Sequence, residues 1–459
     1  MTQNLLSSVG KIFSGLLYDS GLMTGGWENY VMLVVSFVLM YLAIVKKFEP
    51  LLLLPIAFGM FLINVPGAYD VLWGTYNPVP ISEAEFLQLG IELPSGWVFA
   101  DGQILEEIAG TWQIVSEADF EAVFGTLPNG LSYVDGTILK EIAHTYENVQ
   151  NRGLLWYLFY GVQNVIYPPL IFLGIGAMTD FGPLISNPKS MLIGAAAQLG
   201  IFLTLFGAVA IGFDLAAAAS ISIIGGADGP TAIYVTQTLS KFTNEDLLSA
   251  ISVAAYSYMA LIPIIQKPIM KLLVPKKERA IKMKPLRKVS KVEKIVFPVV
   301  VTLVVGILLP DAMPLLGMLM LGNLLKECGV CDRLSTQAQN GLMNTITIFL
   351  GVSVGCKAFG GTFLRLETLK IVGLGLVAFC CGTVGGLLMG RLMCKLSKGK
   401  INPLIGSAGV SAVPMAARIS EDVGRESDPN NHLLMHAMGP NVAGVIGSAI
   451  AAGFLISLF

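Results

Sequence analysis

The residues best suited to chemistry lie in two apolar stretches that are interrupted by glycine and proline. The first, residues 222–231, reads Ser-Ile-Ile-Gly-Gly-Ala-Asp-Gly-Pro-Thr and places Asp228 between glycines. Glycine and proline break helices, and broken backbone survives at membrane depth only where protein or water satisfies its amides and carbonyls. Because a charge at that depth costs roughly 2.5–3.5 kcal/mol, Asp228 is a candidate functional residue. The alternative is an exposed aspartate on a glycine turn at the lipid surface.

A second interrupted stretch, Asn-Pro-Leu-Ile-Gly-Ser-Ala-Gly-Val-Ser-Ala-Val-Pro, begins at Asn402 and ends at residue 414. It contains Ser407 and Ser411, and Asn441 lies in the Gly-Pro-Asn sequence of the last apolar run. A small hard cation takes oxygen ligands from carboxylates, amides, hydroxyls and unwound backbone carbonyls. Together with Asp228, these residues could therefore form a cation site.

Arg418 follows the second interrupted stretch, and Tyr256 and Tyr258 lie inside an apolar run. A buried guanidinium at position 418 would either pair with Asp228 or hold an anionic substrate in its fork. The two phenols are either aromatic filler or part of a proton relay.

Two further pairs have metal-ligand spacing but lack partners. His432 and His436 are four residues apart, with no third ligand evident, so we interpret them as structural or rim residues. Cys328 and Cys331 have CxxC spacing without a second pair or a nearby histidine, which gives little support for a metal or redox role.

The composition indicates a membrane protein. Hydrophobic residues make up 54% of the 459 residues and charged residues only 13%, and the mean hydropathy is +0.71. A soluble chain would carry about a quarter charged residues. We therefore expect a polytopic protein in a lipid bilayer, without a nucleic-acid partner.

Residues 76–152 differ sharply in composition from the rest, with twelve acidic and two basic residues. They contain a tandem repeat with a period of 34: residues 81–86, 93–96 and 101–109 recur at 115–120, 127–130 and 135–143. Ser82 followed by Glu85 resembles a helix capping box, and Ser116 followed by Asp119 is a weaker version. We expect two small αβ units in an extramembrane insert that serves interaction or packing.

The expected organisation follows from the apolar runs. A lead-in and two spans occupy residues 1–75, the acidic insert 76–152, a first membrane repeat 153–266 with its broken stretch at 214–240, a basic loop 267–294, connecting spans 295–334, and a second membrane repeat 335–459 with its broken stretch at 401–417.

The basic loop 267–294 carries eleven Lys and Arg against two Glu, which predicts a cytoplasmic position by the positive-inside rule. Three crossings separate it from the insert if the stretch 214–240 enters the membrane and returns. With three crossings the insert lies on the outer side of the membrane, as its acidity suggests. The charges therefore favour a re-entrant hairpin at 214–240 over a full crossing.

An internal duplication is also visible. Residues 171–176 (Ile-Phe-Leu-Gly-Ile-Gly) recur as 348–353 (Ile-Phe-Leu-Gly-Val-Ser) after 177 residues, and Ile224-Gly225 pairs with Ile405-Gly406 after 181. Five crossings between the copies would invert the second one. We predict an all-α polytopic membrane protein, an inverted-repeat bundle with two interrupted or re-entrant helical elements, plus a small extramembrane α+β insert.

These stretches carry a family resemblance. Residues 225–233 (Gly-Gly-Ala-Asp-Gly-Pro-Thr-Ala-Ile), 402–418 and 436–444 (His-Ala-Met-Gly-Pro-Asn-Val-Ala-Gly) resemble signatures of the β subunits of sodium-pumping, biotin-dependent decarboxylases. Residues 169–183 and 254–260 match as well. The likeness covers 154–459 and the first two spans, whereas the acidic insert departs from the short loop usual in this family.

The resemblance implies a sodium-translocating decarboxylase subunit of the inner (cytoplasmic) membrane. It would decarboxylate carboxybiotin, consume a proton and drive Na+ outward. The implied partners are a carboxyltransferase (alpha) subunit, a biotin carrier protein and a small gamma or delta membrane subunit, with the beta chains forming a homo-oligomer. Oxaloacetate, methylmalonyl-CoA, glutaconyl-CoA and malonate systems all remain open.

The resemblance also implies roles for individual residues. Asp228, Asn402 and Asn441 would be sodium ligands. A second ion or the proton path would use Ser411 and either Tyr256 or Tyr258, Arg418 would bind carboxybiotin, and Gly406 would allow close backbone approach.

Two rival functions fit part of the sequence. A sodium-coupled symporter without decarboxylase chemistry would explain the repeats and broken helices equally well. A structural membrane anchor is disfavoured, because it would gain nothing from a buried Asp228 and a buried Arg418.

Overall fold

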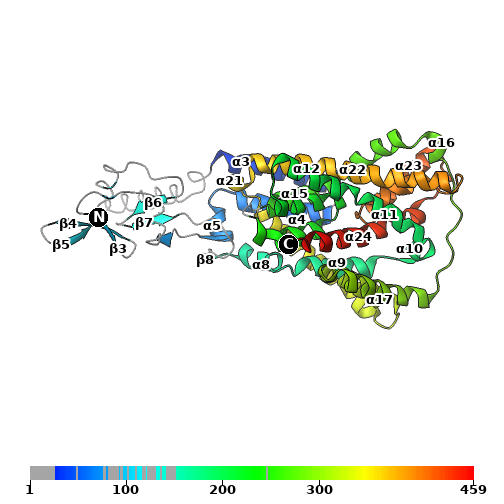
Figure 1. Cartoon of the computed structure of the whole chain (residues 1–459), viewed down its shortest axis with the longest axis horizontal. Helices are drawn as coiled ribbons and strands as arrows, with labels where there is room; N and C mark the ends of the chain where they lie inside the picture. The colour runs from blue at the N-terminus through cyan, green and yellow to red at the C-terminus, as the bar shows by residue number, and fades with distance from the viewer. Residues whose placement is uncertain are drawn as a thin grey trace, which may run out of the picture. The chain divides into compact units, whose positions relative to one another are not determined.

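The chain folds into two compact units in a computed structural model, which describes residues 26–47, 50–75, 79–80, 93, 97–100, 103–108, 111–115, 120, 131–134, 137–140, 151–243 and 247–459 (Figure 1). One unit is Asp70–Trp156, and the other combines Met1–Tyr69 with Tyr157–Phe459.

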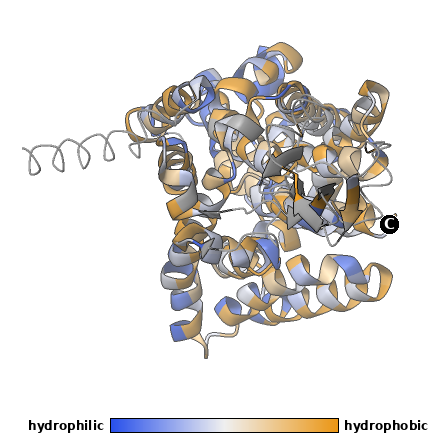
Figure 2. Ribbon diagram, turned by 90° about the vertical axis from the view of Figure 1, so that its left-hand side faces the viewer, coloured by the Kyte–Doolittle hydropathy of each residue, from blue (hydrophilic) through white to orange (hydrophobic). Residues whose placement is uncertain are grey.

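The larger unit is helical. Four of its described helices are long and apolar enough to cross a membrane, or up to six if each of two bent pairs is one span. Hydrophobic residues recur along the helices (Figure 2), and many large ones are exposed. This confirms an all-α polytopic membrane protein. Its longer helices are α3 (Trp27–Ile44), α4 (Pro50–Asn64), α8 (Leu154–Gln163), α9 (Tyr167–Met178), α11 (Met191–Ala197), α12 (Leu199–Ile211), α13 (Leu215–Ser222), α14 (Gly229–Leu239), α15 (Leu248–Leu273), α17 (Lys291–Leu308), α18 (Met313–Glu327), α20 (Met343–Cys356), α22 (Leu366–Leu396), α23 (Met415–Ser427) and α24 (Leu434–Ile456).

Short helical pieces connect these helices. They are α5 (Ala68–Leu72), α10 (Gly182–Ser186), α16 (Lys276–Arg279), α19 (Asp332–Gln337), α21 (Gly360–Phe363), η2 (Pro188–Ser190), η3 (Ile223–Gly226), η4 (Ser240–Phe242), η5 (Pro310–Ala312), η6 (Ala338–Leu342) and η7 (Pro403–Gly409).

The apolar run 154–178 is bent rather than one straight span. Helices α8 and α9 meet at 70°. Pro168 and Pro169 stand in the first turn of α9, where they supply no backbone N–H, and Val165 adopts a positive φ of 57° just before it. The sequence revealed the prolines but not the angle.

The first interrupted stretch is a re-entrant hairpin made of α13, η3 and α14. Asp214 caps the start of α13, and Thr243 follows η4 at the end of the stretch. The Thr243 hydroxyl donates to Asp214 Oδ2 at 2.9 Å, so the chain returns to the end from which it entered. Phe213 lies beside this hairpin base. The Nζ of Lys370, in the first turns of α22, lies 5.9 Å from the centroid of the Phe213 ring.

The second interrupted stretch, η7 followed by extended residues and α23, is also re-entrant. Asn402 at its start and Asn431 after its end both donate from Nδ2 to the carbonyl of Arg279, at 2.8 and 2.9 Å. Near the last turns of α22, Arg391 pairs with Glu278 at 3.1 Å, beside that same loop.

The two hairpins therefore enter from opposite ends of α22, as an inverted repeat requires. Helices α16 and α23 lie together at one end of the helical unit (Figure 1). Two helices outside the repeats pack on them, since α4 of the first two spans packs on α20 of the second repeat and α18 of the connecting spans packs on α9 of the first. Each pairing brings glycine against facing backbone, as small residues do in membrane helix pairs: Gly59 meets Val352, Gly355 meets Ile56, Gly176 meets Leu319 and Gly322 meets Leu173.

The smaller unit contains strands whose pairing follows the 34-residue repeat. Hairpins β3 (Trp97–Ala100)–β4 (Gln103–Ile108) and β6 (Leu131–Val134)–β7 (Thr137–Lys140) are equivalent. Strand β5 (Thr111–Ile114) pairs with β4, and β2 (Val79–Pro80) pairs with β7. Gln103 pairs antiparallel with Thr137, its own repeat equivalent, so the two copies are related by a local twofold.

A separate two-stranded ladder in the smaller unit joins β1 (Gly74–Thr75) to β8 (Asn151–Arg152). The capping boxes predicted at Ser82 and Ser116 lie outside the described residues.

Candidate functional site

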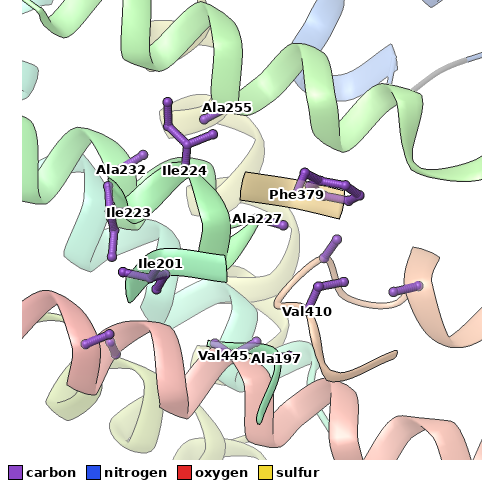
Figure 3. Close-up of a cluster of buried hydrophobic side chains, with 14 of the residues drawn as sticks. Ala197, Ile201, Ile223, Ile224, Ala227, Ala232, Ala255, Phe379, Val410 and Val445 are labelled. Carbon is purple, nitrogen blue, oxygen red and sulfur yellow. The ribbon is translucent and has the colours of Figure 1, made fainter. Parts of the chain in front are cut away.

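The tips of the two hairpins meet in the interior of the helical unit. The Ser411 N–H donates to the carbonyl of Gly226 at 3.1 Å, which joins the second tip to the first. The Ser411 hydroxyl donates to the carbonyl of Gly444 in α24 at 2.9 Å. Apolar side chains surround this junction, with Ala227 and Val410 contributed by the tips themselves (Figure 3).

Asp228 stands at the break of the first hairpin. Ala227 adopts the left-handed conformation (φ 56°, ψ 43°) that ends η3, and Asp228 then caps α14 by accepting from the Thr231 N–H. Its other oxygen, Oδ2, accepts from the Ser448 hydroxyl at 2.8 Å. Because Asp228 is only 5% exposed, the surface-turn alternative is wrong.

Asn441 holds the second tip from α24. Its Nδ2 donates to the carbonyls of Ala408 at 3.0 Å and Val410 at 2.8 Å. Its Oδ1 is buried and has no hydrogen-bond partner among the described residues. Seven residues separate it from Ser448, or about 10.5 Å along the helix. Asn441 therefore offers an acceptor without a described partner two helical turns along α24 from Ser448, the residue that donates to the Asp228 carboxylate.

Asn402 lies at the base of the second hairpin. Its Nδ2 donates to Arg279 and Ile281 carbonyls at 2.8 Å each, and its Oδ1 accepts from the Leu404 N–H at 2.9 Å. Within the described chain, no hydrogen bond joins Asp228 to Asn402 or to Asn441. The structure thus brings Asp228 and Asn441 to the junction of the tips and places Asn402 at the loop.

Gly406 permits close contact between the second hairpin and α22. A Cβ at this position would run into the carbonyl of Gly386 and would lie 2.9 Å from the Cα of Leu387. The backbone that approaches Gly406 is therefore that of the protein itself.

The structure distinguishes the two tyrosines. The Tyr256 ring packs against Gly229, the residue after Asp228, and its buried hydroxyl has no partner among the described residues. The Tyr258 hydroxyl instead donates to the carbonyl of Val372 in α22. Tyr256 is therefore the better placed of the two for proton transfer at Asp228.

For the decarboxylation that the family resemblance implies, we expect Tyr256→Phe to lower the rate by at least about tenfold, because a positioned acid or base contributes 10²–10⁴-fold. Tyr258→Phe is the matched control: it removes a hydrogen bond worth about 1 kcal/mol of stability and should leave the rate within about twofold. The measurement is the single-turnover rate at saturating Na+. Equal losses in both variants would contradict the assignment.

Arg418 is exposed on α23 rather than buried, so the expectation of a buried guanidinium was wrong. It shares a polar face with Asp422, Arg425 and Glu426, which are also exposed. This helix is strongly amphipathic, and its opposite face packs on η7 and α15. No ion pair between Arg418 and Asp228 occurs in the described structure, which leaves the anion-binding alternative.

Two polar residues at the junction were not singled out from the sequence. Ser448 binds Asp228, and Gln198 stands at the break between α11 and α12. The Gln198 Nε2 donates to the carbonyls of Gly194 and Gly444 at 3.2 Å each, while its buried Oε1 has no described partner. Ser448 and Gln198 are each an isolated polar residue in an apolar run. That isolation was the sequence signal by which they could have been found.

The two histidines have different surroundings. His432 Nδ1 lies 3.2 Å from Glu421 Oε1, whereas His436 is in the first turn of α24. Among the residues that the structure describes, no group of three or more His, Cys, Asp or Glu side chains could hold a metal ion.

The site offers a buried carboxylate with hydroxyl and amide oxygens from four elements, the donor set that suits Na+ rather than a transition metal. Inverted hairpins that meet at such a site are characteristic of ion-translocating membrane proteins with discontinuous helices.

The chain belongs to the family described as Na+-transporting oxaloacetate decarboxylase beta subunit, whose model matches residues 28–459. It is 52% identical over 432 residues to methylmalonyl-CoA decarboxylase subunit beta of Propionigenium modestum, covering 94% of this chain and 95% of that protein. It is 49% identical over 449 residues to a probable oxaloacetate decarboxylase beta chain of Vibrio cholerae (96% and 98%). It is 47% identical over 445 residues to glutaconyl-CoA decarboxylase subunit beta of Acidaminococcus fermentans (97% and 97%).

These matches confirm the resemblance and favour the decarboxylase over a symporter without chemistry. The family implies sodium as the transported ion and a chain that works with other subunits. The names of these relatives specify different substrates, and each name describes the relative alone.

Proposed function

We propose that this chain decarboxylates carboxybiotin presented by a partner biotin carrier, consumes a proton and couples the reaction to Na+ export. The observation that supports this most is the meeting of two inverted hairpin tips at a buried carboxylate, in a chain of the Na+-transporting decarboxylase family.

The proposed sodium ligands are oxygens at the junction. Asp228 supplies the charge, and Ser448 and Ser411 supply hydroxyls. The side-chain oxygens of Asn441 and Gln198, which have no hydrogen-bond partner among the described residues, would supply neutral ligands, and hydrogen bonds from the amide nitrogens hold both side chains in place. A ligand role for Asn402 requires a second conformation, because its amide is fully engaged with the loop here.

The chemistry follows from the environment. A carboxylate on a biotin nitrogen is stabilised by water, so drawing it into a drier cavity favours loss of CO2. The biotin supplies the reactive group, while this chain supplies position and electrostatics. Exposed Arg418 can meet the incoming anion, and Tyr256 is positioned to handle the proton near Asp228.

Coupling requires a change in ion access, because moving one charge against 100 mV takes about 2.3 kcal/mol. We hypothesise that sodium at Asp228 favours the inward state that accepts carboxybiotin. After outward release of sodium, a proton would take its place. Opposed hairpins that share one junction suit such a change, since each leads from the site to a different end of α22.

The proposal includes the cellular setting. The partners would be a carboxyltransferase (alpha) subunit, the biotin carrier and a small gamma or delta membrane subunit, with beta chains assembled as a homo-oligomer. The basic loop 267–294 would face the cytoplasm and the insert 76–152 the outside of the inner membrane. The acid that is decarboxylated would be chosen by the carboxyltransferase.

Free carboxybiotin added to the reconstituted full chain tests the proposal. Sodium-stimulated CO2 release above the spontaneous rate is expected. A symporter without chemistry would leave the release at the spontaneous rate, and that result would reject the decarboxylase function.

A further inference from the structure

The two cysteines of the CxxC motif, Cys328 and Cys331, lie on an exposed turn that links the end of α18 to the start of α19. Gly329 in this turn adopts a positive φ of 69°, which glycine accommodates without strain. Val330 beside it is 86% exposed. The other four cysteines lie within helices α20 and α22. The motif is therefore a cysteine pair that a reagent in water can reach.

The two thiols of this motif interact with each other. Each cysteine is half-buried, and a side-chain hydrogen bond joins Cys328 to Cys331. The Cys328 thiol also donates to the carbonyl of Leu325 at 3.3 Å. A disulfide requires side chains that face each other at short range, and thiols in contact meet that requirement. The structure thus adds a direct contact to the CxxC spacing that the sequence shows.

The turn distinguishes the two thiols. The backbone N–H groups of Val330 and Cys331 hydrogen-bond the Cys328 sulfur and, together with the Cys331 thiol, hold the pKa of Cys328 below its ordinary value. The hydrogen bond with Cys328 raises the pKa of Cys331. The thiolate, rather than the thiol, attacks a disulfide. Cys328 is therefore the better attacking sulfur, and Cys331 is placed to react with the product.

Positive charge lies beside the turn. The Lys291 Nζ, at the start of α17, is 3.1 Å from the position that a Cβ on Gly329 would occupy. Lys291 forms no ion pair among the residues that the structure describes, and the first turn of α19 exposes Arg333 next to Asp332. Because Lys291 belongs to the basic loop 267–294, the turn lies at the same end of the helical unit as that loop. A small anionic reagent would meet a cation here.

The turn also connects the two repeats. Helix α18 packs on α9 of the first repeat, with Gly322 against Leu173, and α19 continues through η6 into α20 of the second repeat. Next to the turn, Glu327 pairs with Lys294 at 3.4 Å, and Lys294 also pairs with Asp180 at 2.9 Å. A covalent link across the turn would therefore restrict how the chain enters the second repeat.

We propose that Cys328 and Cys331 form a reversible redox site whose oxidant is a small anionic disulfide of the glutathione type. The Cys328 thiolate attacks one sulfur of that disulfide, the S–S bond breaks, and one small thiol leaves with the proton that Cys328 had lost. The Cys331 thiolate then attacks the Cys328 sulfur, closes the protein disulfide and releases the second small thiol with the proton from Cys331. The two cysteines lose two electrons and two protons, and the small disulfide gains them. This inference does not rest on the proposed function.

Peptide mass spectrometry of the full chain in nanodiscs tests the site. The chain is reduced, freed of reductant, incubated with millimolar oxidised glutathione and then alkylated. Cleavage after Lys326 and Arg333 gives a peptide that contains both cysteines of the motif and no other. We expect the doubly alkylated form of this peptide to fall by at least about tenfold, in favour of a form two hydrogens lighter than the reduced peptide. Dithiothreitol should restore alkylation.

Cys380 and Cys381 are the internal control. They are adjacent in α22, where successive side chains point about 100° apart around the helix. They should therefore form no disulfide with each other and stay open to alkylation after the same treatment.

Cys331→Ser separates ring closure from simple thiol reactivity. This variant should stop at the mixed disulfide, with one glutathione on Cys328, because no second thiol is present to displace it. Cys328→Ser should gain glutathione at least about twofold more slowly, since the remaining thiol ionises less readily. Two glutathiones on the wild-type peptide, a disulfide between two copies seen as a dimer without reductant, or unchanged alkylation would each overturn the proposal. Equal rates in the two variants would overturn the assignment of Cys328 as the attacking sulfur.

Discussion

Asp228→Asn is expected to lower sodium-dependent decarboxylation by at least about 100-fold, equivalent to about 2.7 kcal/mol. The variant keeps the size of the side chain and an oxygen that can cap α14, so the hairpin should still form. It loses the negative charge that would balance a cation in this apolar interior. The measurement is the rate of carboxybiotin decarboxylation against Na+ concentration.

Asp214→Asn is the matched control for this experiment. Asp214 caps α13 in the same hairpin, but it is exposed at the hairpin base and far along the chain from the tip. It should change the sodium dependence by less than about twofold, as expected for an exposed carboxylate. An unchanged sodium dependence in Asp228→Asn would exclude Asp228 as the coupling ligand.

Gly406→Ala is expected to destabilise the second hairpin strongly. The added methyl group would meet the backbone of Gly386 and Leu387, which cannot rotate away as a flexible side chain could. Overpacking of this kind costs about 1–3 kcal/mol. Thermal unfolding of the full chain in detergent should show a lower Tm, together with weakened decarboxylation.

Gly373→Ala provides the comparison in the helix that Gly406 touches. A Cβ at position 373 would have no atom within 4 Å. Alanine is favoured over glycine in a helix by up to about 1 kcal/mol, so this variant should be neutral or slightly more stable. Equal Tm values for Gly406→Ala and the wild type would show that the close approach of η7 to α22 is dispensable.

Much of the fold could be predicted because each membrane helix leaves its own local signal. The run 27–45 corresponds to α3, and the run that begins at Leu433 corresponds to α24. The duplicated motifs at 171–176 and 348–353 lie in α9 and α20. The packing of α4 on α20 and of α18 on α9 could not be predicted, because it depends on tertiary packing of glycines against backbone carbonyls rather than on a local pattern.

The site was less predictable than the fold. Asp228 was visible because a carboxylate inside an apolar run is conspicuous. The contacts of Ser448 and Gln198 were hidden, since a single hydroxyl or amide in an apolar run has many uses. The position of Arg418 was misjudged because its sequence neighbours are apolar, whereas the periodicity of α23 turns it toward the exposed face.

Equilibrium binding of ²²Na+ to the purified full chain tests the central claim most directly. That claim is that one cation is held at the Asp228 carboxylate where the two hairpin tips meet. Saturable binding to the wild type and to Asp214→Asn, with loss in Asp228→Asn, is the predicted result. Binding that is retained in full by Asp228→Asn would contradict it.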